Sequence, residues 1–187
     1  MTRQVLWIAA RFALVYGALT WLAAVTPVYA ALERPCVRVA NALLRESADE
    51  TRALSLEPRD GAAVYLYELR VGSQGRRLER GMHAHGFVEL LFIALVAATP
   101  WGVTRRLGWA LVSGAALVFA VCVLMLMSDV AGWEAEARGA MGLAALSGRP
   151  YAIPLGFVAG LHQTAAAGLI PIAFWTLVTI RPGAPRG

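Results

Sequence analysis

The chain has 187 residues, of which 58% are hydrophobic and only 16% are charged. A soluble domain averages about 45–50% apolar and about 25% charged residues. The composition therefore excludes an intrinsically disordered chain and disfavours an ordinary cytosolic domain. All 17 basic residues are arginine, scattered along a chain of net charge +5. The positive net charge favours contact with anionic membrane lipid. Because no basic run is interleaved with aromatic residues, we expect no nucleic-acid partner.

Long apolar segments alternate with charged stretches, and four of them approach the length of about 20 residues that crosses a bilayer as a helix. The sequence therefore predicts a mainly α membrane protein with four transmembrane helices and a small extracytoplasmic α+β insert between the first two. The expected parts are transmembrane helix 1 in 1–30, the insert in 31–82, transmembrane helices 2–4 in 83–181 (about 85–102, 107–128 and 152–180) and a tail at 182–187.

The first segment also fits a secretory signal peptide. Arg3 and Arg11 could form its basic region, and Val28-Tyr29-Ala30 resembles a small-residue cleavage site. Against cleavage, the apolar stretch is long for a signal peptide, and aromatic residues stand near both of its ends, as in membrane anchors. We expect residues 1–30 to remain as a helix, with cleavage after Ala30 as the alternative.

The arginines of the short loops predict the orientation. Arg105 and Arg106 lie in the shortest connection, which should therefore be cytoplasmic. Arg3 and the two arginines of the C-terminal tail agree with this placement, and the connection Ser128–Pro150, which is not basic, is expected outside as a loop. The prediction is a multi-pass protein of the bacterial inner membrane with both termini in the cytoplasm.

The insert changes character along its length. Apolar residues recur at helical spacing in Pro35–Ser47, which indicates an amphipathic helix at the membrane surface. Thr51–Met82 is rich in β-branched and aromatic residues and in turn signals, which indicates two or three antiparallel strands. Tyr65, Tyr67 and Leu69 share one strand face by their period-two spacing, so we expect this face to pack on the membrane domain or on a partner.

Polar residues gather where the second apolar segment begins. His85 and Glu89 are four residues apart and share a helical face, and His83 lies just before them. Counting inward from the expected cytoplasmic ends places His162 and Gln163 of the fourth segment at a similar depth. We expect these residues to meet in the outer leaflet, with Glu89 paired to His162.

Three interpretations of this cluster stay open. His83, His85, Glu89 and His162 have the ligand chemistry of a zinc, copper or iron site, although their spacing matches no known metal motif. The cluster could also form a proton or ligand pocket. The sequence favours the third interpretation, in which Glu89 holds one helix against another. No catalytic motif is present, Cys36 and Cys122 show no disulfide or metal spacing, and neither an enzyme nor a cofactor is predicted.

The layout of the chain resembles a known family. One apolar helix, an extracytoplasmic insert with a short β-meander, the run Leu90-Leu91-Phe92-Ile93-Ala94-Leu95-Val96-Ala97-Ala98-Thr99-Pro100 and an arginine pair are similar to small exosortase-associated membrane proteins of the exosortase H-associated type. The resemblance spans most of the chain in layout, and its residue-level support is confined to that run. It implies a partner of a membrane-embedded sorting transpeptidase with no activity of its own, so no catalytic residue is carried over.

The sequence therefore predicts an accessory or assembly protein that docks a partner protein at the extracytoplasmic face, in a protein-sorting or cell-envelope system. Two alternatives come from other functional classes. One is a membrane-embedded enzyme or metal-binding protein that uses the His/Glu cluster, and the other is a small transporter subunit.

Overall fold

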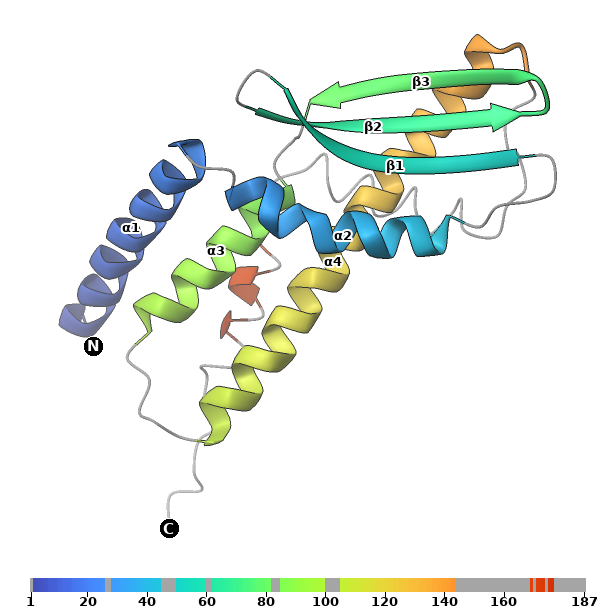
Figure 1. Ribbon diagram of the computed structural model, residues 1–187. Coiled ribbons are helices and arrows are strands. Elements are labelled where there is room, and N and C mark those ends of the chain that lie inside the picture. Colours follow the sequence, from blue (N-terminus) through green and yellow to red (C-terminus); the bar gives the residue numbers. More distant parts are fainter. Residues whose placement is uncertain are drawn as a thin grey trace.

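A computed structural model describes residues 2–25, 28–44, 50–59, 62–81, 85–99 and 105–143, together with residues 169, 171–173 and 175–176. These residues form a helical part and a three-stranded sheet that lies at one end of it (Figure 1). The long helix α4 runs through both parts and joins them.

The first two helices are separated by a proline. Helix α1 spans Thr2–Val25, and helix α2 spans Val28–Leu43. Pro27 lies between them, where its ring disfavours a helical conformation in the preceding residue and its fixed φ suits a helix start. Helix α2 begins earlier than the expected Pro35 because Pro35 is accommodated inside it. Pro35 and Ala31 lie on the exposed side, so the carbonyl that loses its helical donor there is not enclosed by protein.

Helix α3 spans His85–Ala98, and its end before Thr99-Pro100 follows from the same effect of proline on the preceding residue. Helix α4 spans Arg105–Ala140. It ends in a Schellman motif: Leu143 N–H donates to Arg138 O at 2.9 Å, Gly142 N–H donates to Gly139 O, and Gly142 has φ 68°.

The prediction of four transmembrane helices is wrong for the part of the chain that the structure describes. Only two of the described helices are long and apolar enough to cross a membrane, through Leu6–Ala23 and Leu111–Ala140. Helix α3 has 14 residues and is therefore about 21 Å long, shorter than a hydrocarbon core of about 30 Å. The expected fourth segment, 152–180, lies almost entirely outside the described residues.

The expected outside loop at Ser128–Pro150 is also wrong in its first half, because α4 continues to Ala140. The continuation has a helical stripe of buried residues at Val130, Glu134, Ala137 and Arg138, which the sheet covers. Charged residues had suggested a loop, but packing against the sheet keeps this stretch helical.

The sheet confirms the antiparallel strands expected in the insert. Strands β1 (Glu50–Arg59), β2 (Ala62–Val71) and β3 (Gln74–Gly81) pair in the order β1-β2-β3. A two-residue loop joins β2 to β3, and Gly72 at its first position has φ 58°, as tight hairpins favour.

The register places one face of the sheet on the helices. Leu54 of β1 pairs with Tyr67 of β2, and Tyr67 pairs with Leu78 of β3. All three are buried, and they join side chains of α2 and α4 in one hydrophobic core. The core positions that α2 and α4 contribute are Cys36, Val37, Ala40, Val118, Cys122, Val123, Met125, Leu126, Val130 and Ala137.

Candidate functional site

A buried cluster of charges joins the sheet to α4. Arg52 of β1 donates from Nε to Oε1 of Glu134 at 3.0 Å, and Arg138 Nε donates to the same oxygen at 3.1 Å. Arg138 Nη2 also donates to Glu50 Oε2 at 2.7 Å, and Arg52 pairs with the same carboxylate. Two guanidinium groups therefore share two carboxylates, which compensates the desolvation of all four groups. This cluster holds the sheet in a fixed position on α4.

A second polar contact ties α2 to the sheet. The Tyr65 hydroxyl donates to Glu33 Oε2 at 2.8 Å, and both side chains are about 1% exposed. The Tyr65 ring also packs on Trp133 of α4, with centroids 5.7 Å apart. Burial, followed by the negative charge of Glu33, raises the pKa of Tyr65 far above its usual range. The hydroxyl therefore stays protonated and donates to Glu33.

Tyr67 lies beside the charge cluster with its hydroxyl buried. Its side chain is 0% exposed, and its Oη has no hydrogen-bond partner in the structure's described part. Burial is the main cause that raises the pKa of Tyr67, with Glu134 adding to it and Arg52 opposing it. Tyr67 therefore remains neutral and acts as packing under the sheet.

The outer edge of β1 is covered by an asparagine of α2. Asn41 Nδ2 donates to Leu54 O at 2.6 Å, and Leu54 N–H donates to Asn41 Oδ1 at 2.9 Å. The side-chain amide takes the place of a neighbouring strand at this position. It protects the β1 edge from pairing with another chain.

The end of the sheet at which β1 begins carries an open groove of about 400 Å³ around the β2–β3 loop. Three arginines from two strands line it together with polar loop residues. The lining residues are Glu68, Arg70, Gly72, Ser73, Gln74, Gly75, Arg76 and Arg77.

The arginines of this groove differ in their surroundings. Arg77 is shared between Glu57 at 3.5 Å and Glu68 at 4.0 Å, across the outward face of the sheet. Arg70 and Arg76 are exposed, and neither has an ion-pair partner among the described residues. A Cβ placed at Gly75 would come within 3.4 Å of Arg70 Cγ, so the missing side chain there lets Arg70 lie against the β3 backbone. By strand alternation Arg70 lies on the outward face with Arg77, whereas Arg76 pairs with Leu69 on the other face. The groove can therefore offer guanidinium groups from both faces of the hairpin to an anionic group.

The tyrosine face of the sheet was expected to pack on the membrane domain or on a partner, and in the structure it packs on helices of this chain. Tyr65, Tyr67 and Leu69 are each 1% exposed or less, and they pack inside this chain against α2 and α4. A partner protein has no access to them in this structure. The buried tyrosines instead attach the sheet to the helices, and the exposed end of the same hairpin carries the arginines.

The predicted His/Glu cluster lies largely outside the described part. His83, His162 and Gln163 are not among the described residues, and for His85 and Glu89 the structure describes only their place in the first turns of α3. The expected pair of Glu89 with His162 therefore stays a prediction.

Cys36 and Cys122 are both buried and free of any disulfide. Among the residues that the structure describes, no group of three or more His, Cys, Asp or Glu side chains could hold a metal ion. The metal-site and enzyme interpretations therefore depend on residues whose side chains are not described.

No family model, no curated protein and no solved structure matches this chain. The resemblance to exosortase-associated proteins accordingly remains a hypothesis that rests on layout and on the run Leu90–Pro100.

The sequence analysis did not identify two sets of residues. Arg52, Glu134 and Arg138 join the sheet to α4, and Arg70 and Arg76 line the exposed groove. One signal was available for the α4 pair. Glu134 and Arg138 are four residues apart and continue the apolar stripe of Leu126 and Val130, which is the pattern of a helix that has not yet ended.

Proposed function

We propose that this chain is an accessory protein of the bacterial inner membrane that docks a partner protein through the arginine-lined end of its extracytoplasmic sheet. The supporting observation is that one sheet carries both a buried anchor and an exposed cationic end. Arg52 and Glu50 fasten β1 to α4, and at the same end of the sheet Arg70 of β2, which pairs with Thr51, and Arg76 of β3 are exposed beside the β2–β3 loop. The sheet is fixed to α4, and neither Arg70 nor Arg76 forms an ion pair with a carboxylate among the described residues.

Membrane placement is supported by α1 and α4. Both helices start at the end of the helical part that is remote from the sheet (Figure 1), and Arg105 and Arg106 stand at the start of α4. Because arginines near short loops favour the cytoplasmic side, this end is proposed to be cytoplasmic and the sheet extracytoplasmic.

The C-terminal part supports the same orientation for both termini. Trp175 Nε1 donates to Thr99 Oγ1 at 2.7 Å, and Thr99 directly follows α3 at the end remote from the sheet. Trp175 therefore lies close to the side on which α4 begins. We propose that the remaining residues of the chain end on that cytoplasmic side.

The chemistry of the groove selects an acidic partner surface. Guanidinium groups bind carboxylates in a bidentate geometry, and complementary charge accelerates encounter as well as stabilising the complex. The layout resemblance makes a membrane-embedded sorting transpeptidase the first partner to test.

Co-purification from native membranes in mild detergent tests the docking surface. We expect the full chain to retain a transpeptidase, identified by mass spectrometry and by reciprocal capture, and the double variant Arg70→Gln/Arg76→Gln to lose it. The matched control Arg34→Gln/Arg38→Gln removes the same charge from α2 and should retain the partner. Equal retention by both double variants, or no specific partner at low salt, would refute the proposal.

Cysteine labelling tests the orientation separately. Cys36 and Cys122 are buried, so an introduced cysteine should dominate the signal. A membrane-impermeant maleimide applied to intact spheroplasts should label Thr51→Cys on the exposed face of β1 but not Thr104→Cys. The reverse pattern would place the sheet in the cytoplasm.

A further inference from the structure

Helix α2 has a face that no described element covers. Its buried side, at Glu33, Cys36, Val37 and Ala40, packs on the core. The other side is exposed and combines two arginines with small and aliphatic residues. The exposed positions are Ala31, Arg34, Pro35, Arg38, Val39, Ala42 and Leu43.

Polar and apolar residues lie on opposite flanks of the exposed face of α2. With successive residues about 100° apart, Arg34 and Arg38 lie on the flank next to Asn41, whose amide bonds to β1. Val39 and Leu43, which are 37% and 55% exposed, lie on the opposite flank. The polarity therefore falls from the sheet side of α2 towards the side of the apolar helices. This is the order of water, headgroup and acyl chain at a membrane surface.

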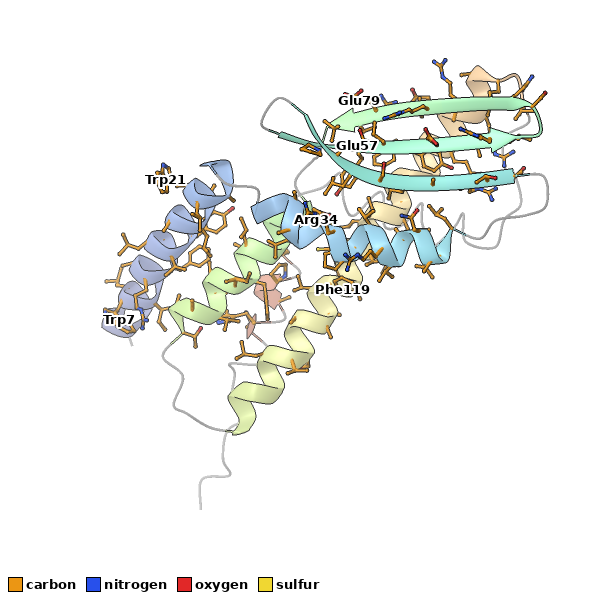
Figure 2. All side chains as sticks on the ribbon, in the orientation of Figure 1. Trp7, Trp21, Arg34, Glu57, Glu79 and Phe119 are labelled. Carbon is orange, nitrogen blue, oxygen red and sulfur yellow. The ribbon has the colours of Figure 1, made fainter. Side chains whose placement is uncertain are left out.

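The position of α2 in the fold agrees with this order. Helix α2 lies between the sheet and the helical part, and Figure 2 places Arg34 at that junction. Trp21, which is 68% exposed, lies near the end of α1 from which the chain enters α2, while Trp7 lies near the other end (Figure 2). Tryptophan is enriched at the two membrane–water interfaces, so Trp21 marks the level of α2 as one of them.

Arg34 and Arg38 are exposed, and no residue that the structure describes forms an ion pair or hydrogen bond with either of them. Like charges four residues apart destabilise a helix unless a counter-charge is supplied from elsewhere. At this level of the fold, the phosphate of a phospholipid headgroup can supply that counter-charge.

We propose that α2 is an interfacial helix whose Arg34 and Arg38 bind the phosphates of anionic phospholipids while Val39 and Leu43 enter the acyl region. The inference rests on the proposed membrane placement of α1 and α4, and it does not depend on the docking of a partner protein. The helix would fix the height of the sheet above the membrane.

Lipid selectivity is the first test. Each cation near an anionic membrane surface contributes about 1 kcal/mol, so two arginines give a preference of about 30-fold for phosphatidylglycerol over phosphatidylcholine. Native mass spectrometry of the detergent-purified full chain, titrated with either lipid, measures this ratio. Arg34→Gln/Arg38→Gln should abolish the preference, and the charge-matched Arg70→Gln/Arg76→Gln should keep it. A preference that survives in the α2 variant, or equally tight binding of inorganic phosphate alone, would overturn the proposal.

Depth measurement is the second test. In vesicles of phosphatidylglycerol and phosphatidylcholine, a fluorophore on Leu43→Cys should be quenched by brominated acyl chains, and one on Thr51→Cys of β1 should not. An unquenched label at position 43 would show that α2 stands clear of the membrane. Because this readout involves no partner protein, a failure of the docking proposal would leave it unchanged.

Discussion

Arg52 and Glu134 are 82 residues apart in the chain, yet Arg52 Nε lies 3.0 Å from Glu134 Oε1 with both side chains buried. The pair connects the first strand of the sheet to the last third of α4. It makes the sheet part of the same rigid unit as a helix that is long and apolar enough to cross a membrane. Any partner bound to the sheet would therefore be positioned relative to that helix.

Neutralising Glu134 should loosen this junction. Glu134→Gln leaves Arg52 and Arg138 with one carboxylate between them, and breaking a buried pair costs about 3 kcal/mol. Denaturant titration of the detergent-solubilised protein, followed by tryptophan fluorescence, measures the free energy of unfolding. Glu136→Gln is the control, because its pair with Arg80 is partly exposed and is worth about 0–1 kcal/mol. Equal, small losses would mean that the cluster does not hold the sheet.

Two glycines of the α4 region should respond in opposite directions to alanine. Gly142 has φ 68° in the Schellman motif, so Gly142→Ala should lower stability by about 1 kcal/mol. Gly132 lies in an exposed helical position with open space around it, so Gly132→Ala should raise stability by up to about 1 kcal/mol. The same denaturant titration measures both variants. Changes of the same sign would show that the helix ends elsewhere.

Removing the asparagine that covers the edge of β1 should lower the free energy of unfolding, because two backbone groups lose their hydrogen-bond partner. Asn41→Ala leaves both Leu54 N–H and Leu54 O without their side-chain partner, which should cost about 2 kcal/mol. Ala42→Ser, on the exposed side of α2, should change stability far less. Size-exclusion chromatography adds a second readout, since an uncovered strand edge promotes association. An Asn41→Ala protein as stable as its control would make the contact incidental.

The tyrosine bound to Glu33 predicts a dependence on alkaline pH. An unfolded tyrosine ionises near pH 10, whereas burial and Glu33 raise the pKa of Tyr65 well above that value. Its contribution to stability is therefore complete below about pH 10 and decreases as the pH rises further, because only the unfolded chain releases the proton. Melting temperatures between pH 8 and pH 11 should fall more steeply for the wild type than for Tyr65→Phe. Parallel curves would contradict the buried, protonated phenol.

Local pattern was enough to predict part of the insert. The antiparallel strands expected in Thr51–Met82 are present, with β2 at Ala62–Val71 and Gly72 in the turn into β3, because β-branched spacing and glycine conformation act over a few residues. The amphipathic helix was also recognisable, although Pro35 suggested too late a start. The backbone carbonyl that loses its helical hydrogen-bond donor to Pro35 lies on the solvent side of α2. This removes most of the energetic cost that usually makes proline end a helix.

The sequence by itself determined the apolar character of the chain, the strands of the hairpin and the shared face of Tyr65, Tyr67 and Leu69. Only the tertiary structure decided what covers that face, where α4 ends and which charges meet. Periodicity assigns residues to a face but does not name the neighbour, and Glu134 and Arg138 looked like loop charges until Arg52 and Glu50 were brought beside them. A buried charge is tolerated only when its partner is in place, and that partner comes from a strand more than eighty residues earlier in the chain.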